Sequence, residues 1–469
     1  MDQSALIEQL FAKIKALEER ILVLENVEKE NVKLRKENTI LREKLSKYEN
    51  PKNSRNSSVP PSKDENRPLK TKSLREPSDK RVGGQQGHEG NTLKMTDTPD
   101  KVIEHVPDFC CACGSDLQNV SVEFVSKRQV IDIPVIKPEY IEYQIFKKQC
   151  SCGHSNCASF PENVNASISY GANAESLVGY FFSRQHIPFF RMKELFNNAF
   201  HLPISEGGIH ELVNRLVAKS APAYQLIKEK ISESKVVGAD ETGAKINGVK
   251  SWIWTWQNDK LTFIVPSDNR GFATIQANFK NGFKNAVLLH DCWKSHFQTP
   301  ALNHQLCTAH LLRELNYFIE TNKDPWATKC RELIRDALHV KQSMKHEDYY
   351  NKHQPKLDIL NRYDKLLEES VDEKIKDLIA FKKRLAKYKG YLFNFLNYPD
   401  VPPDNNGSER AIRNIKVKQK ISGQFKSMTG AMNFAILRSI TDTAIKNGQN
   451  VLSALFTIAT LKVEPVITD

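Results

Sequence analysis

The sequence predicts an α/β fold in which three antiparallel strands are followed by a helix and a fourth strand. The first strand is a β-branched run at residues 235–244. The dipeptide Asn247-Gly248 after it favours a type I′ hairpin, because both central residues of that turn need positive φ. Residues 251–256 then place three tryptophans on one face, which is the period of a half-buried strand whose tryptophans belong to the core. A second turn and the apolar run 261–265 complete a meander.

Residues 270–279 are expected to form a helix, and the apolar run 285–291 has the pattern of a strand buried on both faces. A meander, a crossover helix and a strand that returns parallel to the first is the order of elements in a ribonuclease-H-like fold. In that fold Asp240 and Asp291 lie on adjacent strands. Because a buried carboxylate is costly without a compensating cation, we expect the pair to share divalent metal ions through hard oxygen ligands.

A third carboxylate for such a site is expected from a later helix. Two prolines, Pro402 and Pro403, stop the preceding segment, and a helix is predicted to begin near Asn406 with Glu409 in its first turn. The same spacing is also typical of a capping box, in which Glu409 would serve only the helix end.

The segment after Glu409 is strongly basic. Residues 410–441 contain seven Lys or Arg and no acidic residue. Arg413, Lys416 and Lys420 follow Glu409 on one helical face, and Arg410 is its neighbour. A charge run of this kind can be a solvated face, but a run without acids favours a phosphodiester held beside the third carboxylate.

Four motifs together resemble a known family. They are Asp-Glu-Thr-Gly (240–243), Leu-His-Asp (289–291), Cys-Thr-Ala-His-Leu-Leu-Arg-Glu-Leu (307–315) and Asp-Asn-Asn-Gly-Ser-Glu-Arg (404–410). They are similar to the signatures of the insertion-sequence-66 family of DDE transposases, and the resemblance extends over nearly the whole chain. It implies an enzyme that cleaves the ends of its element and joins the 3′-OH ends to target DNA. Asp240, Asp291 and Glu409 would be its catalytic residues and would hold two Mg²⁺ ions, or Mn²⁺.

Length and charge agree with a DNA-binding protein of several domains. The chain has 469 residues and a formal net charge of +12, and its pI is near 9.1, which favours a polyanionic partner. It contains no stretch of about 18 apolar residues, and its N-terminus does not have the layout of a signal peptide. We therefore expect a cytoplasmic, nucleoid-associated protein without a membrane partner, whose nine cysteines are free thiols or metal ligands.

Residues 1–50 are expected to form a coiled-coil dimerisation arm. One apolar seam contains Ile7, Leu10, Ile14, Leu17, Ile21 and Leu24 and then, after a shift of three residues, Val27, Leu34 and Leu41. Asn31 and Asn38 occupy a positions in the second frame, where paired asparagines favour two strands in register, so we predict a parallel homodimer. The alternative is an amphipathic helix that packs onto its own protein.

Residues 51–100 are predicted to be a basic flexible linker with DNA-contact motifs. Residues 51–81 carry nine Lys or Arg, four acids, five prolines and no aromatic residue, a composition that cannot form a core. Segments 53–62 and 83–90 resemble further signatures of the family. Their glycines and charges would permit close approach to phosphates, although a solvated linker has the same composition.

Residues 101–165 are predicted to be a zinc-binding domain. Its ligands form two knuckles, Cys110-x2-Cys113-Gly and Cys150-x-Cys152-Gly. Four thiolates on tight glycine turns can complete a closed, structural Zn²⁺ site, and the family has a small zinc-binding domain at this place. The second knuckle is shorter than usual, and Cys111 and Cys157 are spare thiols that could substitute. The alternative is a set of unpaired cysteines.

The rest of the chain divides into a connector and an interrupted core. Residues 166–232 are predicted to be a helical connector with breaks at Pro188 and Pro203, and their helix lengths also suit a helix-turn-helix. Residues 233–310 form the first part of the core and residues 399–469 the last.

The interval between the two parts of the core, residues 311–398, has Lys, Glu and Leu at helical spacing and is predicted to be a helical insertion. Cys307 and His310, at its start, belong to the family signature and are possible active-site neighbours.

Two other functions fit the same sequence. One is a catalytically inactive DNA-binding regulator derived from a transposase, and the other is a metal-dependent nuclease without strand transfer. The presence of all three acids favours the transposase over the regulator. The expected partners are the terminal inverted repeats, the target DNA, a second copy of the chain and accessory proteins encoded by the same element.

Overall fold

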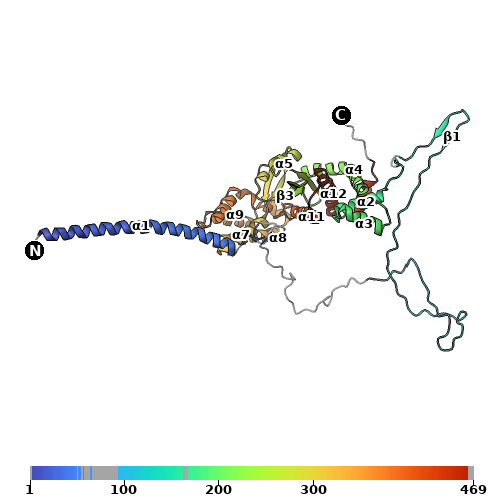
Figure 1. The fold of residues 1–469 in the computed structure, drawn as a ribbon, viewed down its shortest axis with the longest axis horizontal. Coiled ribbons are helices and arrows are strands. Elements are labelled where there is room, and N and C mark those ends of the chain that lie inside the picture. Colours follow the sequence, from blue (N-terminus) through green and yellow to red (C-terminus); the bar gives the residue numbers. More distant parts are fainter. Residues whose placement is uncertain are drawn as a thin grey trace.

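The N-terminal arm is one long helix that projects away from the body of the protein. The computed structural model describes residues 3–49, 51–53, 56–57, 64–65, 93–161, 164 and 166–462. Within that part, α1 (Gln3–Glu49) leaves the body at the end where α7 and α8 lie (Figure 1). The helix is confirmed, and its apolar seam faces solvent, with Leu17 58% and Leu34 50% exposed. Dimerisation through that seam stays a prediction.

The predicted zinc-binding segment is mostly extended in the structure. Its regular elements are β1 (Lys147–Gln149) and β2 (Ser155–Cys157), which form an antiparallel pair. Between residues 119 and 146 there is no helix or strand, and Val125 and Tyr140 are exposed. The predicted linker motif at 83–90 lies outside the described residues, as does most of the segment 53–62.

The connector consists of the three predicted helices. These are α2 (Ala172–Ser183), α3 (Phe189–Ala199) and α4 (Glu206–Ser232). The breaks fall at Pro188 and Pro203, and Ser205 caps α4 by accepting a hydrogen bond from the Gly208 amide at 3.0 Å. The three helices pack on one another and on the C-terminal helices of the chain.

A five-stranded mixed sheet with the order β5-β4-β3-β6-β7 forms the centre of the body. Its strands are β3 (Val236–Ile246), β4 (Val249–Gln257), β5 (Thr262–Ser267), β6 (Phe283–His290) and β7 (Ala301–Leu306). The first three are antiparallel, and Asn247 and Gly248 have φ of 48° and 77°, which confirms the predicted hairpin. Strand β6 runs parallel to β3, and β7 runs parallel to β6. This mixed α/β sheet is consistent with a ribonuclease-H-like core.

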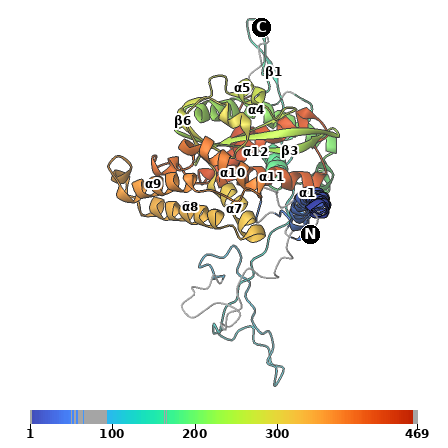
Figure 2. The ribbon, with the colours of Figure 1, turned by 90° about the vertical axis from the view of Figure 1, so that its left-hand side faces the viewer.

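Two details of the sheet differ from the sequence-based expectations. Strand β7, with the mixed sequence Ala-Leu-Asn-His-Gln-Leu, was not predicted, because it has neither an apolar run nor strict alternation. The prediction that residues 251–256 form a half-buried strand was wrong, because β4 is buried on both faces from Ile253 onward. The Phe279 ring, directly after α5 (Phe272–Asn278), packs edge-to-face on the Trp256 ring. Helix α5 and the C-terminal helices lie on opposite sides of the sheet (Figure 2).

Those C-terminal helices are α11 (Asn406–Ser422), α12 (Met428–Lys446) and α13 (Val451–Ala459). Helix α11 begins at the predicted residue and packs on β3 and β4, whereas α12 packs on β5. The β3–α11 contact is close, because a Cβ at Gly238 would lie 2.5 Å from Gln257 Nε2 and 2.6 Å from Asn405 Oδ1. Glycine at this position therefore lets the helix approach the strand.

Residues 311–398, the predicted insertion, are mostly helical. After the short α6 (Lys294–Phe297), its helices are α7 (Thr308–Asn322), α8 (Pro325–Ser343), α9 (Gln354–Glu368) and α10 (Lys376–Lys387). Three 3₁₀ turns complete it, at 346–349, 389–391 and 394–396. The insertion has its own apolar core around Trp326 and Tyr363. In the described part of the chain, no helix is both long and apolar enough to cross a bilayer.

The β3–α11 contact generates a stability prediction. Gly238→Ala should destabilise the protein by about 1–3 kcal/mol, because the new methyl group would overlap Gln257 and Asn405 in a packed layer. Urea denaturation measures the change. Gly243→Ala on the same strand is the matched control: its Cβ would only touch the Trp252 ring at 3.9 Å, so it should change stability by less than about 0.5 kcal/mol. Equal effects of the two substitutions would contradict the close contact.

Candidate active site

Three carboxylates from separate segments are directed to one edge of the β3–β6 pair. Gly238 on β3 is the partner of Leu289 on β6, so Asp240 and Asp291 each lie two residues beyond a paired position on adjacent parallel strands. Glu409 is in the first turn of α11. The residue before that helix, Asn405, donates from Nδ2 to the Ala239 carbonyl at 2.8 Å, which attaches the start of α11 to the strand that carries Asp240.

The three acids interact electrostatically. Burial raises the pKa of Asp240 well above its usual range, and the neighbouring charges of Glu241 and Asp291, with a smaller contribution from Glu409, raise it further. Asp240 is half-buried, and the side chains of Asp291 and Glu409 are 32% and 27% exposed. The site therefore concentrates negative charge where the carboxylates are still accessible.

A fourth acid, Glu241, is fully engaged by two cationic partners. Its carboxylate accepts from Arg270 Nε at 2.9 Å through one oxygen and from His296 Nε2 at 3.1 Å through the other. Burial alone would raise the pKa of Glu241, but the hydrogen bonds and charges of His296 and Arg270 lower it. The sequence analysis did not identify this cluster, although Glu241 adjoins Asp240 in the same motif. His296 Nε2 also lies 3.9 Å from Asp291 Oδ1, so the cluster borders the site.

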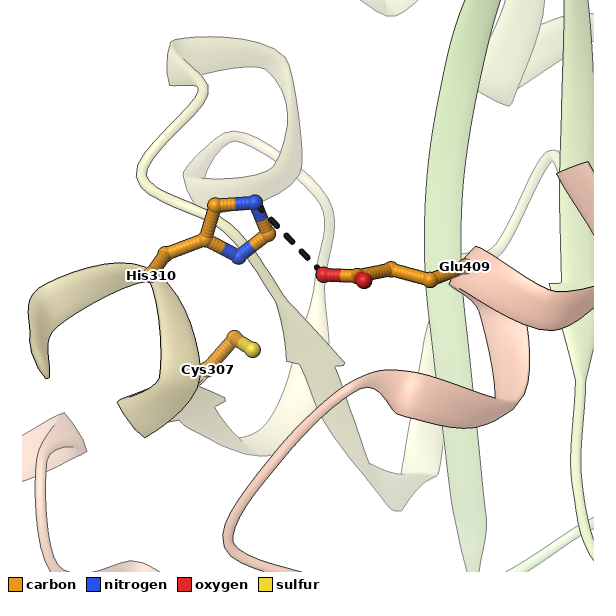
Figure 3. A group of neighbouring side chains, drawn as sticks. All are labelled: Cys307, His310 and Glu409. Carbon is orange, nitrogen blue, oxygen red and sulfur yellow. Dashed lines mark ion pairs between the residues drawn. The ribbon is translucent and has the colours of Figure 1, made fainter. Parts of the chain in front are cut away.

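Glu409 points to the helical insertion and not to its own helix end (Figure 3). Its Oε1 atom accepts from Arg313 Nη2 on α7 at 3.0 Å and lies 3.7 Å from His310 Nε2. Asn405 is the N-cap residue of α11, and its own side chain makes no capping hydrogen bond; the Asn406 amide donates instead to Asp404 Oδ1 at 3.0 Å. The capping-box alternative for Glu409 is therefore not what the structure contains.

Cys307, His310 and Glu409 form a group that could hold a metal ion, with one ligand atom of each within 4.8 Å of the others (Figure 3). Burial raises the pKa of the Cys307 thiol to about 11, and the Asn405 amide donates to its Sγ atom at 3.2 Å. Among the described residues this is the one group of three such ligands that comes so close. The three acids and the four knuckle cysteines do not meet that closely.

The two cysteine knuckles are present as separate turns. Gly114 and Gly153 have φ of 74° and 90°, which is the left-handed conformation that glycine permits. Each turn is closed by a backbone hydrogen bond, from Gly114 to Cys110 at 2.8 Å and from Gly153 to Cys150 at 2.9 Å. A hydrogen bond from Ser115 lowers the pKa of Cys113 to about 7, which favours a thiolate.

The basic helix presents its cations on two faces. Arg410, Arg413 and Lys420 are exposed, and Lys416 donates to the Gly243 carbonyl on β3. Lys418, in contrast, is buried over the Phe182 ring at 4.8 Å, and this burial lowers its pKa to about 8. Of the seven basic residues in the run, Lys418 and Arg438 are buried, whereas the exposed cations of α11 and Lys426 beyond its end are available to a polyanion.

The match to a known family covers the three acids and the basic helix α11 but not the cysteine knuckles. A family model described as "Transposase IS66 family" matches residues 169–433, more than half of the chain. No curated protein matches the chain. The matched range contains the connector, the sheet, the insertion and all three acids. The chain belongs to the IS66 family of transposases.

Proposed function

We propose that this protein is a DNA transposase that cleaves the ends of its insertion sequence and joins the 3′-OH ends to target DNA. Its family supports a transposase-type function on DNA. The observation that carries the proposal is the placement of Asp240, Asp291 and Glu409, because register and the β3–α11 contact direct three distant carboxylates to one edge of the sheet.

The donor set of this edge fits divalent metal ions, which the family implies. Three carboxylates offer the hard oxygen ligands that Mg²⁺ and Mn²⁺ prefer. The pKa of Asp240 is raised first by burial and then by the neighbouring acids, and a bound cation would offset both effects. Asp240, Asp291 and Glu409 would hold two such ions. Bound there, such ions would supply Lewis-acid activation of the attacking oxygen, of water in cleavage and of the 3′-OH in joining, and charge stabilisation of the leaving oxygen.

The neighbouring cations hold the carboxylates in place. Arg313 fixes Glu409, so the acid is already oriented by an ion pair from α7. Both oxygens of Glu241 are occupied by Arg270 and His296, so Glu241 is a supporting residue and not a fourth ligand. His296 borders Asp291 at 3.9 Å and can orient that carboxylate as well.

The DNA backbone would bind along the exposed face of α11. Arg410, Arg413 and Lys420 are exposed on the helix that carries Glu409, and Lys416 lies between this face and β3. Such contacts supply affinity without reading sequence. We assign both the terminal inverted repeats and the target DNA to this interface, with accessory proteins of the same element as further partners.

Two accessory modules complete the proposal. The open seam of α1 would pair with that of a second copy in a parallel homodimer, which would bury its exposed leucines and pair Asn31 and Asn38 in register. The knuckles would bind one structural Zn²⁺ through Cys110, Cys113, Cys150 and Cys152, because each glycine turn offers half of a tetrahedral site.

Two other functions would give different results in the same assays. A DNA-binding regulator without chemistry would bind the element's ends but not cleave them. A metal-dependent nuclease would cleave them but not join the 3′-OH ends to a second DNA. An assay with pre-cleaved ends and a plasmid target therefore distinguishes the transposase from both.

Asp240→Asn, Asp291→Asn and Glu409→Gln should each lower Mg²⁺-dependent cleavage and joining at least about a hundredfold, because each removes a charged ligand. DNA affinity should change little, because cations elsewhere supply it. Gel assays with labelled element ends measure both. Glu368→Gln, at an exposed acid at the end of α9, is the matched control and should retain activity. Full cleavage by Glu409→Gln would remove that residue from the catalytic set and make Asp404 the next candidate.

Arg413→Ala and Lys420→Ala should each weaken DNA binding and reduce the slope of log affinity against log salt by about 1, because each removes one phosphate contact. Fluorescence anisotropy over a salt series measures the slope. Lys418→Met on the buried face of α11 is the control and should leave the slope unchanged. A slope that responds to Lys418→Met and not to Arg413→Ala would contradict this interface.

Elemental analysis of the purified protein should find one Zn²⁺ per chain. Replacing Cys110 and Cys113 by serine should lower the content to less than about 0.2 per chain, because half a tetrahedral site binds the ion weakly. Replacing Cys111 and Cys157 instead should leave it near one. A protein without zinc whose residues 100–160 are protected from proteolysis would contradict the site.

A further inference from the structure

The segment that follows α1 lies against the helical insertion. Lys52 Nζ is 3.2 Å from Asp377 Oδ2 on α10 and 4.9 Å from the centre of the Tyr317 ring on α7. The ammonium group thus has both an anionic and an aromatic partner. Lys52 and Asp377 are 325 positions apart in the sequence.

A compact turn continues this contact. The Asn53 amide donates to Asn56 Oδ1 at 2.8 Å, and Ser57 Oγ donates to the Asn53 carbonyl at 2.6 Å. The Asn56 amide donates in return to Asn53 Oδ1 at 3.3 Å. The side chain of Asn56 then donates from Nδ2 to Glu320 Oε2 on α7 at 3.0 Å. The two asparagines therefore build the turn, and the second one attaches it to the insertion.

The burial of these polar residues is unusual for a linker. Asn56 is 3% and Ser57 6% exposed, whereas such residues in a solvated segment are mostly exposed. A buried amide is tolerated only where its hydrogen bonds are satisfied, and those of Asn56 are satisfied by the turn and by Glu320. Such burial indicates a specific contact within the protein. It differs from the contact with DNA that the basic composition of this segment favoured.

Helix α7, which contacts Lys52 and Asn56, also contacts Glu409. Arg313, which pairs with Glu409, is one helical turn before Tyr317, and Glu320 follows in the next turn of α7. One end of α7 therefore supports a proposed catalytic acid, and the other end supports the base of the arm.

We infer that the described residues 51–53, 56 and 57 form a docking segment that anchors the N-terminal arm to the helical insertion of the same chain, with α7 as the support shared by the arm and Glu409. The inference concerns an interaction surface and holds whatever chemistry the acids perform. Its partner is the surface formed by Tyr317, Glu320 and Asp377.

Hydrogen exchange of the full-length protein, followed by mass spectrometry, tests the docking. Amides of residues 53–57 and of the second half of α7 should be protected in the unchanged protein. Asn56→Ala should accelerate their exchange about tenfold, because it leaves Glu320 without this partner. Lys52→Glu and Asp377→Lys should each accelerate it several-fold, and the combined charge swap should restore protection. Glu373→Lys, at an exposed acid next to α10, is the control and should have no effect.

Two results would overturn the inference. One is exchange of residues 53–57 at the rate of an unstructured peptide in the unchanged protein. The other is a loss of DNA affinity in Lys52→Glu that the charge swap with Asp377→Lys does not restore, because Lys52 would then contact phosphate and not Asp377.

Discussion

The contact between β3 and the start of α11 determines where the proposed active site forms. Glu409 is far from Asp240 in sequence, and it reaches the sheet because Asn405 bonds to the Ala239 carbonyl and because Gly238 leaves room for the helix. Without this close approach, the distance between the helix and the strand would grow by the width of a side chain. Glu409 would then lie farther from the acids of β3 and β6. The contact also places the exposed cations of α11 beside the same edge of the sheet.

At that edge of the sheet, some acids are paired with neighbouring side chains and others remain accessible. The buried Glu241 is hydrogen-bonded by Arg270 and His296, and Arg270 itself lies between the Trp252 and Trp293 rings at 4.6 and 3.7 Å. Asp240 has no such cationic partner among the described contacts, and burial together with the charges of Glu241 and Asp291 raises its pKa. The two acids thus differ in the neighbours that the protein supplies, which agrees with the proposed supporting role of Glu241 and the proposed catalytic role of Asp240.

Much of the fold could be predicted because its signals are local. The Asn247-Gly248 turn, the proline breaks around α3 and the start of α11 each depend on a few neighbouring residues. The contacts that complete the site join distant segments instead. Arg313 and Glu409 are 96 positions apart, and Asn56 and Glu320 are 264 apart, so no local pattern contains them. Strand β7 was not predicted for a related reason, because its position depends on pairing with β6 and not on its own composition.

The helical insertion forms a layer that covers part of the sheet. Val287 on β6 and Leu306 on β7 are buried in the apolar core of the insertion, together with residues of α7, α8 and α10. The insertion therefore supplies part of the apolar cover for these two strands, a task that a short loop between Leu306 and Val401 could not perform. A minimal version of the enzyme that lacked these helices would expose two strands beside Asp291 to water, so the insertion and the sheet must be inherited, exchanged or engineered as one unit.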